Sequence, residues 1–171
     1  MGQAQSPHQN LSGNAAIDKI KNLAEEARTC FFTTNIGLNA LSIPMTLQEV
    51  DESGVLWFIS SSESEHNKNI MQDRRVQLYF MNSSSYEYVF LNGDAMISKD
   101  KALIDKYWSS FANAWFDGKD DPRVTVIGVK ATTGSYYETK DNKIFAMAKM
   151  AFAAITGSKN DDGGREGELK V

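Results

Sequence analysis

Short segments rich in β-branched, aromatic and aliphatic residues recur along this chain, and turn-forming residues separate them. In segment 40–48, apolar residues alternate with smaller or polar ones, which is typical of a strand with one buried face. About six such segments with helices between them predict a mainly β (α+β) domain that closes fully or partly into a barrel. The expected strands are 29–35, 40–48, 55–60, 76–81, 86–98 and 124–137.

Helical spacing of apolar residues predicts helices at 14–28, 64–72, 100–111 and 143–155. Ser12 or Asn14 is the expected cap of the first helix. Pro44 has no backbone N–H, so its strand is expected at an edge, or beside a bulge or a ligand. Gly93 lies inside a long strand and predicts a bulge or a sharp bend there.

The chain has 171 residues, the size of a single domain. We expect a flexible N-terminus over 1–12, a folded domain over 13–157 and a polar C-terminal tail over 158–171 that lacks a packed core or closes over a neighbouring subunit. A net charge of −4 without a basic stripe argues against nucleic acid as a partner. Neither a membrane-spanning stretch nor a signal pattern is present, so we expect a cytoplasmic protein with no membrane partner.

Candidate catalytic and metal-binding side chains are few. The single cysteine, Cys30, lies in an apolar run and is expected to be buried and inert. The two histidines, His8 and His66, have no neighbours at metal-ligand spacing, and no serine lies in a nucleophile elbow. The acidic loop 117–121 is expected to be solvated and to cap the next strand. We therefore predict no metal site and no catalytic side chain.

One segment favours phosphate binding. Residues 57–70 run from a strand through Ser60, Ser61 and Ser62 into the start of a helix. Hydroxyl groups and free backbone N–H groups converge at such a start, together with the positive end of the helix dipole. Ser64 as a plain helix cap explains the same residues equally well, and both interpretations stay open at this point.

An ordered series of motifs runs through roughly residues 14–157. In chain order it comprises Leu41-Ser42-Ile43-Pro44-Met45, Leu56-Trp57-Phe58-Ile59-Ser60, Ser64-x-His66-x-x-Asn69-Ile70, Val76-Gln77-Leu78-Tyr79-Phe80, Gly93-Asp94-Ala95, residues 114–123 and Gly134-Ser135-Tyr136-Tyr137. The series resembles the general stress protein 26 branch of the pyridoxamine 5′-phosphate oxidase-like split-barrel flavoproteins, and residues 115–122 point to this branch.

The resemblance implies a six-stranded split β-barrel with flanking helices, and a homodimer with FMN at the subunit interface. It implies that Tyr88 reaches the flavin from the second subunit and that Trp115 covers the ring. Since a flavin carries the redox chemistry itself, an absence of catalytic side chains agrees with it. The implied cofactor-binding residues are Pro44, Met45, Thr46, Leu47, Gln48, Phe58, Ile59, Ser60, Ser64, His66, Tyr88 and Trp115.

The chain also departs from the family pattern. Ile43 and His66 stand where the relatives have an arginine and a lysine that bind the phosphate. We therefore expect a weaker affinity for the phosphate unless Lys68, Arg74 or Arg75 compensates. The motif that the true oxidase uses for its pyridoxine substrate is absent. We expect an FMN-dependent oxidoreductase of the general stress type, acting on an unknown small molecule. The alternatives are a non-catalytic flavin-binding or sensing stress protein, or a split barrel for FAD or a deazaflavin.

Overall fold

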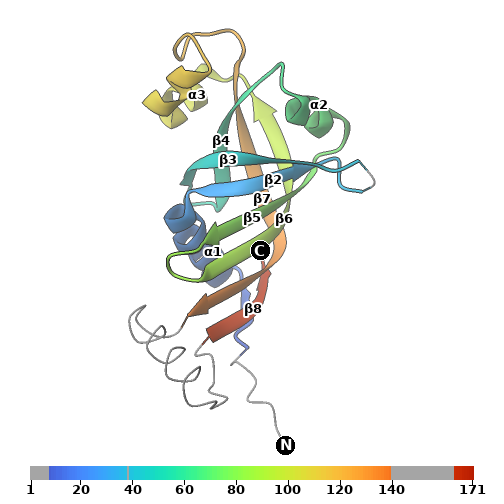
Figure 1. Ribbon diagram of the computed structural model, residues 1–171, viewed down its shortest axis with the longest axis vertical. Coiled ribbons are helices and arrows are strands. Elements are labelled where there is room, and N and C mark those ends of the chain that lie inside the picture. Colours follow the sequence, from blue (N-terminus) through green and yellow to red (C-terminus); the bar gives the residue numbers. More distant parts are fainter. Residues whose placement is uncertain (1–7, 38, 140–163) are drawn as a thin grey trace, which may run out of the picture.

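The computed structural model describes residues 8–37, 39–139 and 164–171 (Figure 1). Within this part of the chain, six antiparallel strands close into a split barrel of the expected kind, because β7 pairs with both β4 and β6. Around the ring the order is β7 (Val124–Thr139), β4 (Val55–Ser61), β3 (Leu41–Val50), β2 (Thr29–Thr34), β5 (Arg75–Asn82) and β6 (Glu87–Ser98).

Strand β7 is longer than the barrel needs and carries an extension of the sheet. Its first half pairs with β4, and its last residues pair with β8 (Gly164–Lys170). The two-residue strand β1 (Leu11–Ser12) pairs with β8 in parallel. Strands β1 and β8 therefore lie side by side at the edge of this extension, which is at the opposite end of the molecule from α3 (Figure 1).

This extension corrects the expectation for the two ends. The C-terminal residues 164–170 form a strand and bury Leu169 to 1% exposure in the main core, so they are no tail without a packed core. Residues 8–12 are likewise tied down, with Gln9 N donating to Glu166 O at 3.0 Å. Beyond the stretch that pairs with β4, one edge of β7 has backbone N–H and C=O groups that need hydrogen-bond partners, and β8 provides them. Residues 1–7 and 158–163 lie outside the described residues.

The helices are α1 (Asn14–Ala27), α2 (Glu65–Gln72), α3 (Lys101–Tyr107) and the short 3₁₀ helix η1 (Ser110–Ala114). The expected helix 100–111 thus splits in two, and 143–155 lies outside the described residues. The capping prediction for α1 was wrong: Gly13 occupies the cap position because Ser12 is paired in β1 and Asn14 is already helical. None of the described helices is long and apolar enough to span a membrane.

Two hydrophobic clusters stabilise the molecule. The main one fills the barrel and packs against the apolar face of α1. The second lies outside the barrel wall, where Trp57 of β4 stacks on Tyr107 of α3 with ring centroids 4.8 Å apart. Residues 124–129 are all buried because alternate side chains face the two clusters.

Two special strand residues lie as the sequence predicts. The register between β6 and β7 shifts between Asn92 and Gly93, and a Cβ atom at Gly93 would lie 2.7 Å from the carbonyl oxygen of Lys130. Pro44 pairs with Phe31 of β2, whereas the β3–β4 ladder begins only at Leu47. Among the described strands, none pairs with one side of β3 around Pro44, and that side borders a cavity.

Candidate functional site

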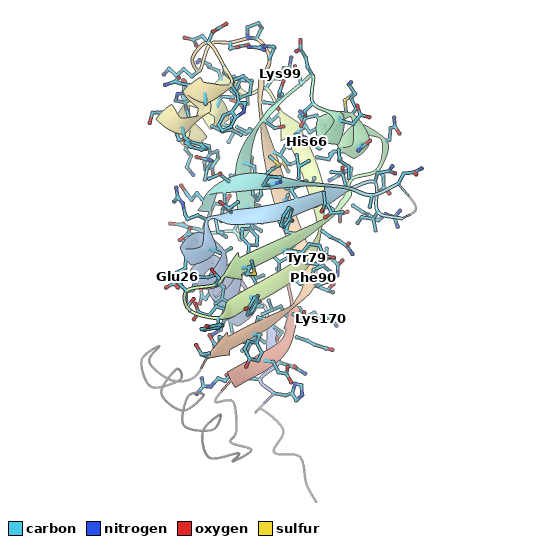
Figure 2. All side chains as sticks on the ribbon, viewed as in Figure 1. Glu26, His66, Tyr79, Phe90, Lys99 and Lys170 are labelled. Atoms are coloured by element: carbon cyan, nitrogen blue, oxygen red, sulfur yellow. The ribbon has the colours of Figure 1, made fainter. Side chains whose placement is uncertain are left out.

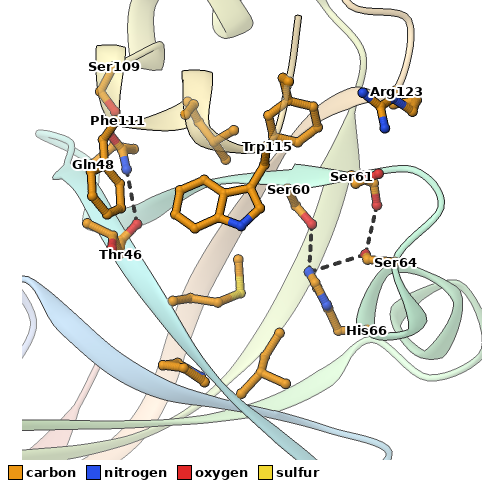
Figure 3. Close-up of a pocket in the computed structure, with 16 residues that line it drawn as sticks. Thr46, Gln48, Ser60, Ser61, Ser64, His66, Ser109, Phe111, Trp115 and Arg123 are labelled. Atoms are coloured by element: carbon orange, nitrogen blue, oxygen red, sulfur yellow. Dashed lines mark hydrogen bonds between the residues drawn. The ribbon is translucent and has the colours of Figure 1, made fainter.

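A cavity of about 430 Å³ opens between the free half of β3, the end of β4, the start of α2 and the helix η1 (Figure 3). Its two ends differ chemically. Hydroxyl, imidazole and guanidinium groups gather at one end, whereas the other combines apolar and aromatic side chains with Thr46, Gln48 and Ser109 (Figure 3). Its lining residues are Ile43, Pro44, Met45, Thr46, Gln48, Ile59, Ser60, Ser61, Ser64, His66, Ser109, Phe111, Ala112, Trp115, Phe116 and Arg123.

His66 is the centre of the polar end. Ser60 Oγ donates to Asn67 Oδ1 at 2.8 Å, and Ser64 Oγ donates to the carbonyl oxygen of Ser61 at 2.7 Å. Both hydroxyl protons are then used, yet His66 Nε2 lies 2.6 Å from Ser60 Oγ and 3.2 Å from Ser64 Oγ (Figure 3). His66 must therefore donate, which fixes its proton on Nε2.

This network is anchored in the barrel wall. Asn67 is 1% exposed and donates through Nδ2 to Thr125 Oγ1 of β7 at 3.0 Å. The start of α2 is thus fastened to β4 through Ser60 and to β7 through Thr125. The polar end is consequently a rigid feature rather than a loop that must be ordered by a ligand.

Burial of His66 predicts a pH effect on stability. Loss of hydration lowers the pKa of His66 below its ordinary value of 6.5. At pH values just below 6.5 the unfolded chain then binds more protons than the native one, so the free energy of unfolding falls as the pH falls.

The variant His66→Gln keeps an N–H donor but does not titrate. In urea denaturation it is expected to lose less free energy of unfolding than the wild type between about pH 7.5 and about pH 5.5. Equal losses in the two proteins would contradict the assignment.

The first turn of α2 supplies further donors. Ser64 caps the helix by accepting from Asn67 N at 3.2 Å, and Ser64 O accepts from Lys68 N. Among the described residues, none accepts from the backbone N–H of Glu65 or of His66. Ser64 is therefore a helix cap, and two backbone donors are left beside the polar end of the cavity.

Arg123 lies at the same end, on the residue that precedes β7. Its Nε and Nη2 atoms donate to the two carboxylate oxygens of Asp121 at 3.1 and 2.7 Å. The Asp121 side chain is only 3% exposed and also accepts from the backbone of Asp117 and Arg123. The guanidinium holds the pKa of the Asp121 carboxyl well below its usual range. The acidic loop does cap the next strand, but Asp121 is not solvated.

The opposite wall is aromatic. Phe111 and Trp115 lie on and just after η1, with their ring centroids 5.1 Å apart in an edge-on arrangement. They are 63% and 61% exposed, which is high for large aromatic side chains. Figure 3 shows the Trp115 indole over the middle of the cavity, and Phe111 beside Thr46 and Gln48. A flat ring system would find stacking partners here.

The cavity brings together most of the residues that the resemblance implied. Leu47 and Phe58 are not among them: both side chains are fully buried in the barrel core, and Leu47 N donates to the carbonyl oxygen of Arg28. Tyr88 lies on the outer face of β6, away from this cavity, and its role toward a second subunit stays a prediction. The implied residues that do line the cavity are Pro44, Met45, Thr46, Gln48, Ile59, Ser60, Ser64, His66 and Trp115.

Lys68, Arg74 and Arg75, the three candidates for a compensating cation, all have other partners. Lys68 pairs with Glu65, Arg74 donates to the carbonyl oxygen of Ala95, and Arg75 pairs with Asp73. None of the three lines the cavity, whereas Arg123 does. The pairing of β4 with β7, in which Ser61 faces Val124, brings Arg123 beside the serine-rich turn, residues 60–62. Sequence reasoning missed Arg123 because this pairing is not local in the sequence.

Comparison with known proteins gives consistent matches. Residues 15–161 match the family described as pyridoxamine 5′-phosphate oxidase like. The protein bli-3 of Neurospora crassa is 31% identical over 127 residues, which are 68% of this chain and 61% of bli-3. The match thus spans less than two thirds of that relative's length.

Solved structures share the fold. A protein assigned as general stress protein 26 from Jannaschia sp. CCS1 superposes with a TM-score of 0.71 at 23% identity, covering 91% of this chain and 95% of that one. The general stress FMN/FAD binding protein of Xanthomonas citri gives a TM-score of 0.63 at 21% identity, with coverages of 74% and 91%.

Proposed function

The chain belongs to the pyridoxamine 5′-phosphate oxidase-like family, and from this premise we propose that it is a flavoprotein that binds FMN in the cavity between β3 and η1. The observation that carries the proposal is the polarity of this cavity, with anion-binding groups at one end and aromatic groups at the other. An FMN molecule has the same division, with a phosphate at one end and a flat tricyclic ring at the other. The description of the Xanthomonas citri relative as FMN/FAD binding supports the proposal.

The polar end fits a phosphate group. Ser64, His66 with its free backbone N–H group, and the Arg123 guanidinium border it, and the free N–H group of Glu65 lies between Ser64 and His66 in the chain. Backbone donors at a helix start combined with hydroxyl and guanidinium groups are a common phosphate-binding set. Because α2 is anchored through Asn67, these donors are already in place before a ligand arrives.

The aromatic end fits a flavin ring. Met45 and Ile43 offer apolar surface from β3, and Trp115 offers a ring face from the opposite wall. Gln48 Nε2 donates to the carbonyl oxygen of Thr46 at 3.1 Å, which orients its amide oxygen as an acceptor. Thr46 and Gln48 are the polar groups that would bind the edge of the ring.

When bound, the flavin supplies the electron-transfer chemistry. The chain's own residues would orient the ring, and Phe111 and Trp115 would keep water from it. Among the described residues, the aromatic end is lined by no titratable side chain. We therefore propose an FMN-dependent oxidoreductase of the general stress type that takes protons from its substrate or solvent. Because this end offers no acid or base, flavin binding without turnover is the second candidate.

We expect purified protein to bind one FMN per chain, seen as saturable quenching of flavin fluorescence. Thr46→Trp, which fills the cavity from β3, should abolish this binding. Thr132→Trp, the same change at an exposed position of β7, should leave it intact.

A protein that gains no flavin signal on titration would refute the proposal, as would equal binding by both variants. Oxidation of NADH or NADPH that depends on an added acceptor would separate the oxidoreductase from the binding protein.

We further propose that the chain acts as a homodimer. A row of side chains crosses the outer face of the barrel, in which Pro44, Phe31, Tyr79 and Phe90 are successive register partners on β3, β2, β5 and β6. Phe31 is 56% and Tyr79 45% exposed, and Tyr79 packs on Phe90 with ring centroids 4.8 Å apart (Figure 2). An apolar patch of this kind on a sheet favours a protein partner.

The row supports a second copy as that partner, because it begins at Pro44, which also lines the cavity. A partner on this face would lie next to the cavity mouth. It could thus contribute Tyr88 to the flavin site, in agreement with the resemblance.

A further inference from the structure

Arg123 is the one permanent cation among the described residues that line the cavity. The family resemblance implies phosphate-binding cations at two positions, which Ile43 and His66 occupy here. Ile43 has no charge, and burial favours the neutral form of His66. A phosphate dianion at the polar end needs a positive charge that these two residues do not supply.

We propose that Arg123 is the cationic ligand of the flavin phosphate, with Asp121 as its positioning residue; the inference rests on the proposed flavin binding. The positive charge for the phosphate would then come from the loop before β7, rather than from β3 or α2. Arg123 would thus contact the phosphate from the side of β7, and the serine-rich turn and the start of α2 would contact it from the other side.

The guanidinium is held in a fixed orientation. Asp121 occupies Nε and Nη2, and the Phe116 ring lies below the guanidinium with its centroid 5.9 Å from the Cζ atom. No described residue accepts a hydrogen bond from Nη1, and the side chain is 40% exposed. A guanidinium has five N–H donors, so it can bind a carboxylate on one edge and a phosphate on another.

The backbone fixes the distance between Arg123 and the serine-rich turn. Ser62 N donates to the carbonyl oxygen of Arg123 at 2.8 Å, and the adjacent pair in the ladder is Ser61 with Val124. Arg123 is therefore a direct neighbour of the turn that leads into the cap residue Ser64. Both lie on the cavity wall, so one anion can contact both.

Other charges near the guanidinium are acidic. Glu63 and Asp117 act on Arg123 through space in addition to Asp121. These carboxylates repel a bound phosphate. The orientation of the guanidinium N–H donors therefore matters more for binding than the net charge around the phosphate. For that reason a lysine, a point charge without the fork, should not replace Arg123 fully.

The test compares FMN with riboflavin, which has the same ring but no phosphate. Arg123→Gln is expected to weaken FMN binding by ~10- to ~100-fold, the usual range for one charge-assisted contact. Riboflavin affinity should stay within about twofold of wild type. Arg123→Lys should fall between wild type and Arg123→Gln for FMN.

Arg75→Gln is the matched control. Arg75 forms the same fork with Asp73, with Nε and Nη2 contacts of 3.0 and 2.7 Å, but it does not line the cavity. This variant should bind both flavins as wild type does. Thermal unfolding followed by circular dichroism reports whether each variant folds, and if Arg123→Gln does not, Arg123→Lys decides the question.

An equal loss of FMN and riboflavin affinity on changing Arg123 would overturn the inference, because it would indicate a structural role. Unchanged FMN affinity would overturn it as well, while the proposed function would survive. A wild-type protein that binds neither flavin would instead refute the proposed function, and this inference with it.

Discussion

Replacing Phe58 with alanine is expected to lower the free energy of unfolding by about 3–5 kcal/mol, the usual range for removing a buried phenyl ring. Phe58 is fully buried in the barrel and meets Phe32 edge-on, with ring centroids 5.3 Å apart. Phe32 on β2 and Phe58 on β4 both point into the barrel core. The surrounding strands cannot move in to fill the space that the removed ring would leave. Since domains of this size are stable by only about 5–15 kcal/mol, the loss is a large fraction of the total.

Phe111→Ala makes the same chemical change at a side chain that is 63% exposed. It is expected to lower the stability far less, because little apolar surface returns to water. Urea denaturation of both variants measures the difference. A small loss for Phe58→Ala would contradict its assignment to the core and favour the flavin contact that the family resemblance implies.

Tyr79→Arg is expected to convert the proposed dimer into a monomer. Tyr79 lies in the middle of the apolar row, between Phe31 and Phe90. An unpaired charge buried in an interface costs about 3–5 kcal/mol, which weakens association by ~100-fold or more. If the partner completes the cavity, FMN affinity should fall along with dimerisation.

Size-exclusion chromatography with light scattering measures this change. Met71→Arg is the control, since Met71 is 81% exposed on α2 and lies outside the row. It should leave the mass in solution unchanged. A wild-type protein that is monomeric at all concentrations would refute the proposed dimer, and a Tyr79→Arg dimer would show that the interface lies elsewhere.

Local signals in the sequence predicted most of the fold correctly. Alternation marked β3, helical spacing marked α1, and the bulge at Gly93 followed from a glycine inside a long strand. The C-terminal strand β8 was not predicted because glycine and charged residues dominate it. Its one buried large side chain, Leu169, is explained only by the pairing with β7. Strand formation there depends on a partner, which local sequence does not record.

The site residues also divide into those that local sequence predicts and those that only tertiary contacts bring together. Ser60, Ser64 and His66 are neighbours in sequence, so a strand followed by a helix start was enough to group them. Arg123 joins them only through the pairing of β7 with β4, and Phe111 only through the packing of α3 on the outside of the barrel. The resemblance also implies flavin contacts from Leu47 and Phe58, but alternation along β3 and β4 turns their side chains into the core.

The two hydrophobic clusters give the cavity walls separate supports. The floor on β3 is held by the barrel core, whereas the roof on η1 follows α3, which packs on Trp57 and Val126 outside the barrel. Residues of the roof can therefore be substituted without loosening the barrel beneath the cavity. In such a split barrel, changes in the roof can alter which molecules the cavity admits, while the floor formed by the barrel keeps its structure.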